Sequence, residues 1–171
     1  MKNVLLILAG IILSVMPFKE QKQNEIVIPD DSIRLRVISN SNDELDLHKK
    51  QELKSFLEDI LYNLIKDVKT KDEVNEIIIN NLDEINEKIA NFLGNNNYKL
   101  DYGLNYFPRK VYKGVVYKEG MYDSLVVELG SGKGSNWWCV LFPPLCLLEE
   151  NTTTTDVEYK LFISRIIQSI K

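Results

Sequence analysis

The 171-residue sequence is poor in the side chains that build metal centres and many catalytic sites. It contains one histidine, His48, and two cysteines, Cys139 and Cys146, which lie close together near the C-terminal end. Zinc sites take three or four Cys, His or carboxylate ligands at close spacing. We therefore expect no metal and no cofactor.

The sequence also lacks an excess of basic residues. Its 21 Lys and Arg residues are outnumbered by 25 Asp and Glu residues, which gives a formal net charge of −4. Binding to nucleic acid needs a concentrated basic surface, so we expect no nucleic-acid partner.

No uncharged run is long enough for an ordinary transmembrane helix. The run Val4–Val15 is shorter than the roughly 20 residues that a membrane span needs, and it follows a single lysine. This pattern is typical of a secretory signal, read by the export machinery, although no A-x-A-like cleavage site follows. We predict a signal peptide or N-terminal membrane segment at residues 1–18, with membrane contact only there. A linker over 19–32 and one folded domain over 33–171 are predicted to follow.

Alternating patterns predict the strands of a sheet. Ile33–Ile38 alternates apolar with cationic residues, which indicates a half-buried strand, and Tyr98–Tyr106 alternates Tyr and Leu with other residues. Val111–Tyr117 and Trp137–Phe142 read as two more strands. Leu125–Leu129 is apolar without alternation, so we expect it at the centre of the sheet with both faces covered.

Helical patterns follow the first of these strands. Ser41 with Glu44 and Thr70 with Glu73 match the capping box that opens a helix, and Gly94 is placed to end the second helix in a left-handed cap. Apolar residues then share one helical face: Leu53, Phe56, Leu57, Ile60, Leu61, Leu64 and Val68 in the first helix, and Val74, Ile78, Leu82, Ile85, Ile89 and Phe92 in the second. We expect two long helices that pack as an antiparallel pair.

A third capping box, Thr155 with Glu158, predicts a C-terminal helix. Its inward residues are predicted to be Val157, Leu161, Ile166, Ile167 and Ile170. The element order predicts an α+β fold: an antiparallel or mixed sheet of about four or five strands, with two long helices and the C-terminal helix packed on it.

The segment Gly130–Cys146 holds both tryptophans and both cysteines of the chain. Its glycine-rich start is not a phosphate-binding loop, because Lys133 is followed by Gly134 instead of Ser or Thr and no helix follows. Trp137 and Trp138 point to opposite faces of a strand, so either both pack in the interior or the outward one contacts a partner. The candidate partner-binding residues are Lys133, Asn136, Trp138, Phe142, Pro143 and Pro144.

The two cysteines leave alternatives open. Cys139 and Cys146 are candidates for a disulfide, which export permits and which would add roughly 2–3 kcal/mol in the chain-entropy model. They could equally be two buried free thiols. A thiol nucleophile would have to use His48, which lies beside Lys49 and Lys50 on an expected exposed stretch.

Several segments, in the right order, resemble the stage II sporulation protein R family. The matching positions are Ile33–Ile38, Asn40, Ser41, Asp46, Lys50, Phe107, Pro108, Lys110, Tyr112, Gly114, Gly120–Tyr122, Leu125 and, most specifically, Gly130–Cys146. The departures lie in turns: Ser39 and Asn42 stand where the family tends to have Ala and Asp, and Lys118 with Glu119 where Pro-Ala is usual.

The resemblance implies a signalling protein and not an enzyme. Such a protein is made in the forespore and exported into the space between forespore and mother cell. There it activates the membrane-embedded aspartic protease of the mother cell, stage II sporulation protein GA, which processes pro-sigma-E to active sigma-E. Two alternatives are an exported thiol-dependent hydrolase that uses Cys139 or Cys146, and a passive spore-envelope component.

Overall fold

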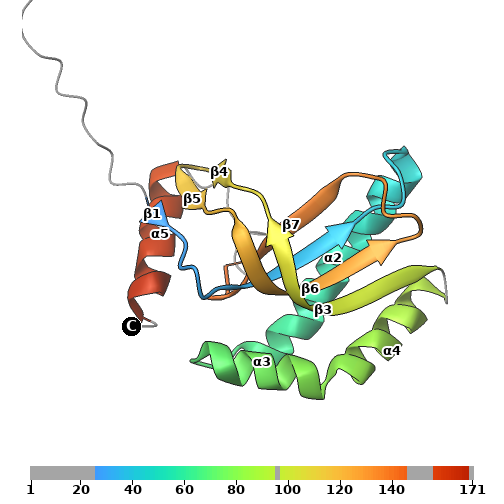
Figure 1. Ribbon diagram of the computed structural model, residues 1–171, viewed down its shortest axis with the longest axis horizontal. Coiled ribbons are helices and arrows are strands. Elements are labelled where there is room, and N and C mark those ends of the chain that lie inside the picture. Colours follow the sequence, from blue (N-terminus) through green and yellow to red (C-terminus); the bar gives the residue numbers. More distant parts are fainter. Residues whose placement is uncertain (1–25, 95–96, 146–155, 170–171) are drawn as a thin grey trace, which may run out of the picture.

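The structure is a computed structural model that describes residues 26–94, 97–145 and 156–169 (Figure 1). Its elements, in chain order, are β1 (Ile26–Val27), β2 (Ile33–Ile38), α2 (Glu44–Ile65), α3 (Lys71–Asn80), α4 (Leu82–Leu93), β3 (Tyr98–Phe107), β4 (Lys110–Tyr112), β5 (Val115–Tyr117), β6 (Gly120–Leu129), β7 (Asn136–Phe142) and α5 (Asp156–Ser169).

The strands form two mixed sheets, which confirms the α+β prediction. The larger sheet has the order β3-β6-β2-β7, in which β2 runs parallel to β6 and antiparallel to β7. The smaller sheet has the order β1-β5-β4 and is built on the hairpin of β4 and β5. As predicted, Leu125–Leu129 lies in an inner strand, β6, where Leu125 and Val127 are fully buried.

The two faces of the larger sheet are covered by different parts of the chain. Ile33, Leu35 and Val37 of β2 face α2, α3 and α4 and belong to the main hydrophobic core. The residues between them, Arg34 and Arg36, point to the opposite face, where a second cluster is formed with the small sheet and α5. Figure 1 shows α5 and the small sheet together on the left of the view, with α4 at the lower right.

This second cover corrects the prediction that β2 is half-buried. Arg34 is 0% exposed, because aromatic residues of the second cluster lie over it. Within the predicted linker, Ile26 and Val27 pair with β5 and Ile28 is buried. The predicted signal segment, residues 1–18, lies outside the described residues.

The helices follow the predicted pattern with two corrections. The box of Thr70 with Glu73 is confirmed, and Gly94 adopts the left-handed conformation with φ 64°. The box of Ser41 with Glu44 is wrong, because the Ser41 hydroxyl is used by other groups next to the helix start. The second helix is not continuous: it breaks at Asn81, whose side-chain amide donates to the carbonyl of Ile77 at 2.7 Å.

Two further predictions need correction. Val111–Tyr117 is a hairpin and not one strand, because Lys113 and Gly114 both have positive φ, 47° and 72°, as a two-residue type I′ turn requires. In α5 the inward residues are Tyr159 and Ile163, with Ile166 and Ile167 packed beside them, whereas Leu161 is 56% exposed.

Some residues of the predicted C-terminal helix cannot be compared with the structure. Thr155 and Ile170 and the side chains of Val157 and Glu158 lie outside the described positions. Among the helices in the described ranges, none has the length and apolar character that a membrane span requires.

Candidate partner-binding site

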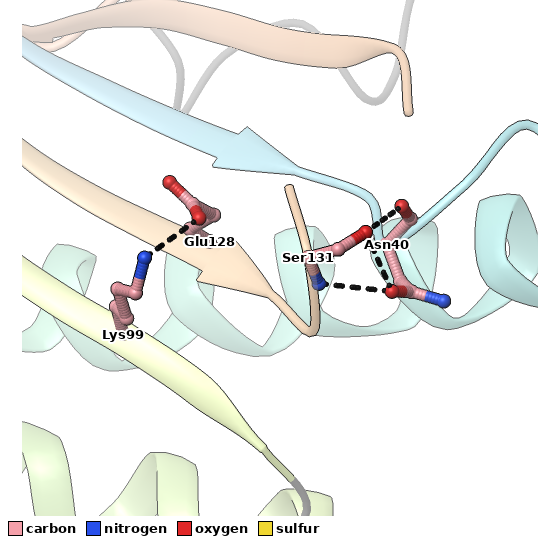
Figure 2. Close-up of polar contacts among 4 residues, drawn as sticks. All are labelled: Asn40, Lys99, Glu128 and Ser131. Atoms are coloured by element: carbon pink, nitrogen blue, oxygen red, sulfur yellow. Dashed lines mark hydrogen bonds and ion pairs between the residues drawn. The ribbon is translucent and has the colours of Figure 1, made fainter. Parts of the chain in front are cut away.

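The glycine-rich connection between β6 and β7 is fastened to the turn after β2. The backbone N–H of Ser131 donates to Oδ1 of Asn40 at 2.9 Å, and the Ser131 hydroxyl donates to the Asn40 carbonyl at 3.0 Å (Figure 2). Beside it, Lys99 of β3 pairs with Glu128 of β6 at 3.2 Å, which joins the ends of these two strands (Figure 2). Side-chain contacts therefore anchor the connection to the turn after β2 and join the two strand ends beside it.

Backbone contacts extend the pairing of β2 and β7 into this turn. Gly134 donates to the Ser39 carbonyl at 2.9 Å, and Ser39 donates to the Ser135 carbonyl at 3.2 Å. A Cβ at Gly134 would lie 2.1 Å from the backbone oxygen of Ser41, so this position requires glycine because of the close approach of the two chains.

The first two turns of α2 complete the arrangement. Oδ2 of Asp46 accepts from the Asn40 amide at 2.8 Å and from the Ser41 hydroxyl at 2.7 Å. These hydrogen bonds, that from Ser41 first, hold the pKa of the Asp46 carboxyl below its usual value. Lys50 donates to the Ser135 hydroxyl at 2.8 Å. We call these six residues the loop clamp: Asn40, Ser41, Asp46, Lys50, Ser131 and Ser135.

Sequence patterns alone do not reveal the loop clamp as a site. Its members were noted as positions of resemblance, and Ser41 also as a capping residue. They come from two regions that are far apart in the chain, residues 40–50 and residues 131–135. The available signal was that these positions of the resemblance are polar and lie outside the apolar faces expected for the core. The clamp presents Lys133 and Asn136, two of the candidate contacts, in exposed positions. Leu45, at the start of α2, is 85% exposed.

The other candidate residues lie toward the far end of β7. Trp138 and Phe142 are 9% and 6% exposed, Pro143 is buried and Pro144 is half-buried. Trp138 therefore packs in the interior, as in the first of the two alternatives, and does not present an outward-facing ring. Because a strand rises about 3.3 Å per residue, Asn136 and Phe142 are about 20 Å apart, and the six candidates do not form one exposed patch.

The two tryptophans pack on opposite faces of β7, as expected for neighbours on a strand. Trp137 lies half-buried against the main core, with Nζ of Lys54 5.2 Å from its ring centroid. Trp138 belongs to the second cluster, where its ring meets Phe107 edge-on at 5.4 Å and Tyr117 at 5.5 Å between centroids. Both rings thus contribute to packing.

A buried arginine lies against Trp138. The Arg34 guanidinium carbon is 3.4 Å from the ring centroid of Tyr122 and 5.1 Å from that of Trp138, and Nη2 donates to the Lys118 carbonyl at 3.2 Å. Its Nε and Nη1 find no hydrogen-bond partner among the described residues. Desolvation by burial lowers the pKa of Arg34 to about 10.

The structure describes only one of the two cysteines, Cys139. Cys139 is disulfide-bonded and 8% exposed, but Cys146 lies outside the described residues, so its pairing with Cys139 stays a prediction. His48 is exposed on α2, with Nδ1 3.5 Å from a carboxylate oxygen of Glu52. Within the part of the chain that the structure describes, no group of three or more His, Cys, Asp or Glu side chains is placed to hold a metal ion.

Comparisons with known proteins agree with the resemblance. A family model described as "Stage II sporulation protein R (spore_II_R)" matches residues 29–152. A curated protein of Bacillus subtilis (strain 168) named "Stage II sporulation protein R" is 33% identical over 153 residues, which is 85% of this chain and 68% of that protein. No solved structure matches.

Proposed function

Because the chain belongs to the stage II sporulation protein R family, we propose that it is an exported sporulation signal that activates a membrane-embedded protease. In this proposal it leaves the forespore and acts in the space between forespore and mother cell. Its target is the mother-cell aspartic protease, stage II sporulation protein GA, which then processes pro-sigma-E. The family match carries the proposal, since it spans the loop clamp and most of the second cluster.

An activator of this kind has to bind the active state of the protease more tightly than the inactive state. Each tenfold difference in affinity between the two states corresponds to about 1.4 kcal/mol. The loop clamp favours such selective binding, because it holds Lys133 and Asn136 in a fixed geometry before binding and so lowers the entropy lost on association. We propose this end of β7 as one contact with the protease.

The alternative of a thiol-dependent hydrolase has less support. The nucleophile in such chemistry is a thiolate, whereas Cys139 is buried and disulfide-bonded. No specific observation favours a passive envelope component. The signalling proposal therefore stands as the function that the molecule supports best.

Reconstitution in a non-sporulating bacterial host tests the proposal. The protease and pro-sigma-E are co-expressed with the full chain, or with a chain that starts after Met16 and lacks the N-terminal apolar run. We expect cleavage with the full chain and little with the truncated chain. Equal cleavage with both would contradict action from outside the membrane, and no cleavage with all components expressed would contradict the activator role.

A pair of charge variants tests the contact. Lys133→Glu changes an exposed residue presented by the loop clamp, and Lys66→Glu makes the same charge change at an exposed position after α2. We expect Lys133→Glu to lower pro-sigma-E processing, while Lys66→Glu leaves it at the level of the unmodified chain. Equal processing with both variants would remove Lys133 from the contact.

A further inference from the structure

A cavity of about 200 Å³ lies between the outer strand β7 and the hairpin strand β4. Ligand pockets for whole small molecules enclose roughly 300–1,000 Å³, so this cavity has the size for a single side chain. Its described walls are mostly aromatic, and they come from both sheets. They are formed by Lys110, Tyr112, Tyr117, Trp137, Trp138 and Cys139.

The charge in and behind the cavity is positive. Lys110 is exposed, with Nζ 5.0 Å from the ring centroid of Trp138 and 5.6 Å from that of Tyr112. The Arg34 guanidinium carbon lies 5.1 Å from the ring centroid of Trp138, so a second cation stands behind one aromatic wall of the cavity. No carboxylate is among the described residues that line the cavity.

The nearby acids do not balance this charge. Asp30, which acts on Arg34 only at longer range, accepts a hydrogen bond from Lys118 at 2.9 Å. Two nitrogens of Arg34, Nε and Nη1, have no hydrogen-bond partner among the described residues, although the side chain is fully buried. A buried charge without a carboxylate is costly for the isolated protein, and its field reaches further in a low-dielectric interior than in water.

We propose that this cavity receives an Asp or Glu side chain of the protein that the chain activates. The incoming carboxylate accepts a charge-assisted hydrogen bond from Lys110, while the methylene groups of the side chain pack on Tyr112 and Trp138. The positive field of Arg34 favours the same charge. The inference rests on the proposed function, since it names the chemistry by which the protease is recognised.

The occupant is assigned to a protein and not to a lipid because the cavity is enclosed by side chains on several sides and fits one side chain. A phospholipid headgroup would instead meet the exposed residues at the hairpin surface, such as Val111, which is 51% exposed. Anionic vesicles therefore provide the arm of the experiment that separates the two sources of negative charge.

The test uses the full chain in the co-expression assay with protease and pro-sigma-E. We compare Lys110→Glu and Lys110→Arg with Lys66→Glu, which makes the same charge reversal away from the cavity. We expect Lys110→Glu to lower processing about tenfold or more, because a charge-assisted contact is replaced by repulsion. Lys110→Arg keeps the charge and should retain most processing. Equal urea midpoints of the purified chains exclude a folding defect.

A charge exchange completes the test. Single Asp→Lys and Glu→Lys variants of the extracytoplasmic loops of the protease are paired with Lys110→Glu, and one pair should recover processing. Undiminished processing with Lys110→Glu would overturn the inference while the proposed function stands. No processing with the unmodified chain would overturn both. The vesicle arm compares binding of the unmodified chain and of Lys110→Glu to anionic phosphatidylglycerol vesicles and to neutral phosphatidylcholine vesicles. If Lys110→Glu loses binding only to the phosphatidylglycerol vesicles and still supports processing, Lys110 contacts lipid instead.

Discussion

Oδ1 of Asn40 accepts the backbone N–H of Ser131 at 2.9 Å, although the two residues are 91 positions apart in the sequence. This contact joins the turn after β2 to the glycine-rich connection before β7. The same Asn40 side chain donates to Asp46 at the start of α2. One residue therefore ties together three segments on which the proposed contact with the protease depends.

Asn40→Ala should destabilise the protein. The variant loses the hydrogen bonds to Ser131 and Asp46, and we expect the free energy of unfolding to fall by about 1–2 kcal/mol. Asn63→Ala is the matched control, since Asn63 makes one exposed contact within α2, and its effect should stay within about 0.5 kcal/mol. Urea unfolding of both variants measures the difference. Equal losses would contradict the special role of Asn40.

Gly134→Ala should be more harmful than Gly103→Ala. The new Cβ at Gly134 would lie 2.1 Å from the Ser41 carbonyl oxygen and 2.2 Å from the Ser39 hydroxyl, so the two chains must separate. We expect Gly134→Ala to lower the free energy of unfolding by about 1–3 kcal/mol. A Cβ at Gly103 meets only a carboxylate oxygen of Asp101 at 4.0 Å, and alanine there should be neutral or slightly stabilising. Thermal unfolding of the two variants gives the comparison.

The stability that the Asp46 carboxylate contributes should depend on pH. Its pKa is lowered in the folded state, first by the hydrogen bond from Ser41, so its contribution is present above the unfolded pKa of about 3.9 and is lost as pH falls through the folded value. Asp46→Asn should therefore be less stable than the unmodified chain at neutral pH, and the gap should narrow below about pH 4. If the difference in unfolding free energy between the two chains stays constant down to about pH 2, below the usual carboxyl range, the Asp46 carboxylate does not stabilise the fold through these hydrogen bonds.

Trp138→Ala should unfold the second cluster and not merely remove a surface contact. Trp138 is 9% exposed and packs on Phe107 and Tyr117. We therefore expect Trp138→Ala to lower the free energy of unfolding by about 3–5 kcal/mol. Trp137→Ala should cost less, because Trp137 is only half-buried. Chemical unfolding followed by circular dichroism measures both. An unchanged midpoint for Trp138→Ala would contradict the packing role.

The cysteines should act as one structural unit. We expect Cys139→Ser, Cys146→Ser and the double variant to lose the same stability, about 2–3 kcal/mol, because each opens the predicted disulfide. Peptide mass mapping without reductant should find the two cysteines linked. A single variant that abolishes activity but keeps its unfolding midpoint would favour the thiol-dependent hydrolase.

Local patterns in the sequence predicted those elements whose signals are local. Alternation located Ile33–Ile38, the apolar run located Trp137–Phe142, and the Thr70 box and Gly94 marked real helix ends. The break at Asn81 was missed because the apolar residues on both sides of it keep one helical period. The hairpin turn was missed because Lys113 has a positive φ although lysine is not a residue that sequence patterns associate with such turns.

The site was less predictable, because its parts meet only in the folded chain. Alternation placed Arg34 on a solvent-facing side of its strand, whereas the small sheet and α5 cover that side. The strict alternation of Tyr98–Tyr106 predicted a strand, which is confirmed, but it did not show that Leu104 and Tyr106 are 66% and 55% exposed. The sequence contains no local signal for contacts such as Asn40 with Ser131.

The most direct measurement places the chain and the substrate on opposite sides of one membrane. Purified protease is reconstituted in vesicles in one orientation, with pro-sigma-E on the side of the catalytic domain and the full chain added to the other side. We expect cleavage to start when the chain is added opposite the substrate, and we expect Lys110→Glu to reduce the cleavage rate. Cleavage at the same rate without the chain, or only when it is added on the substrate side, would contradict activation from outside.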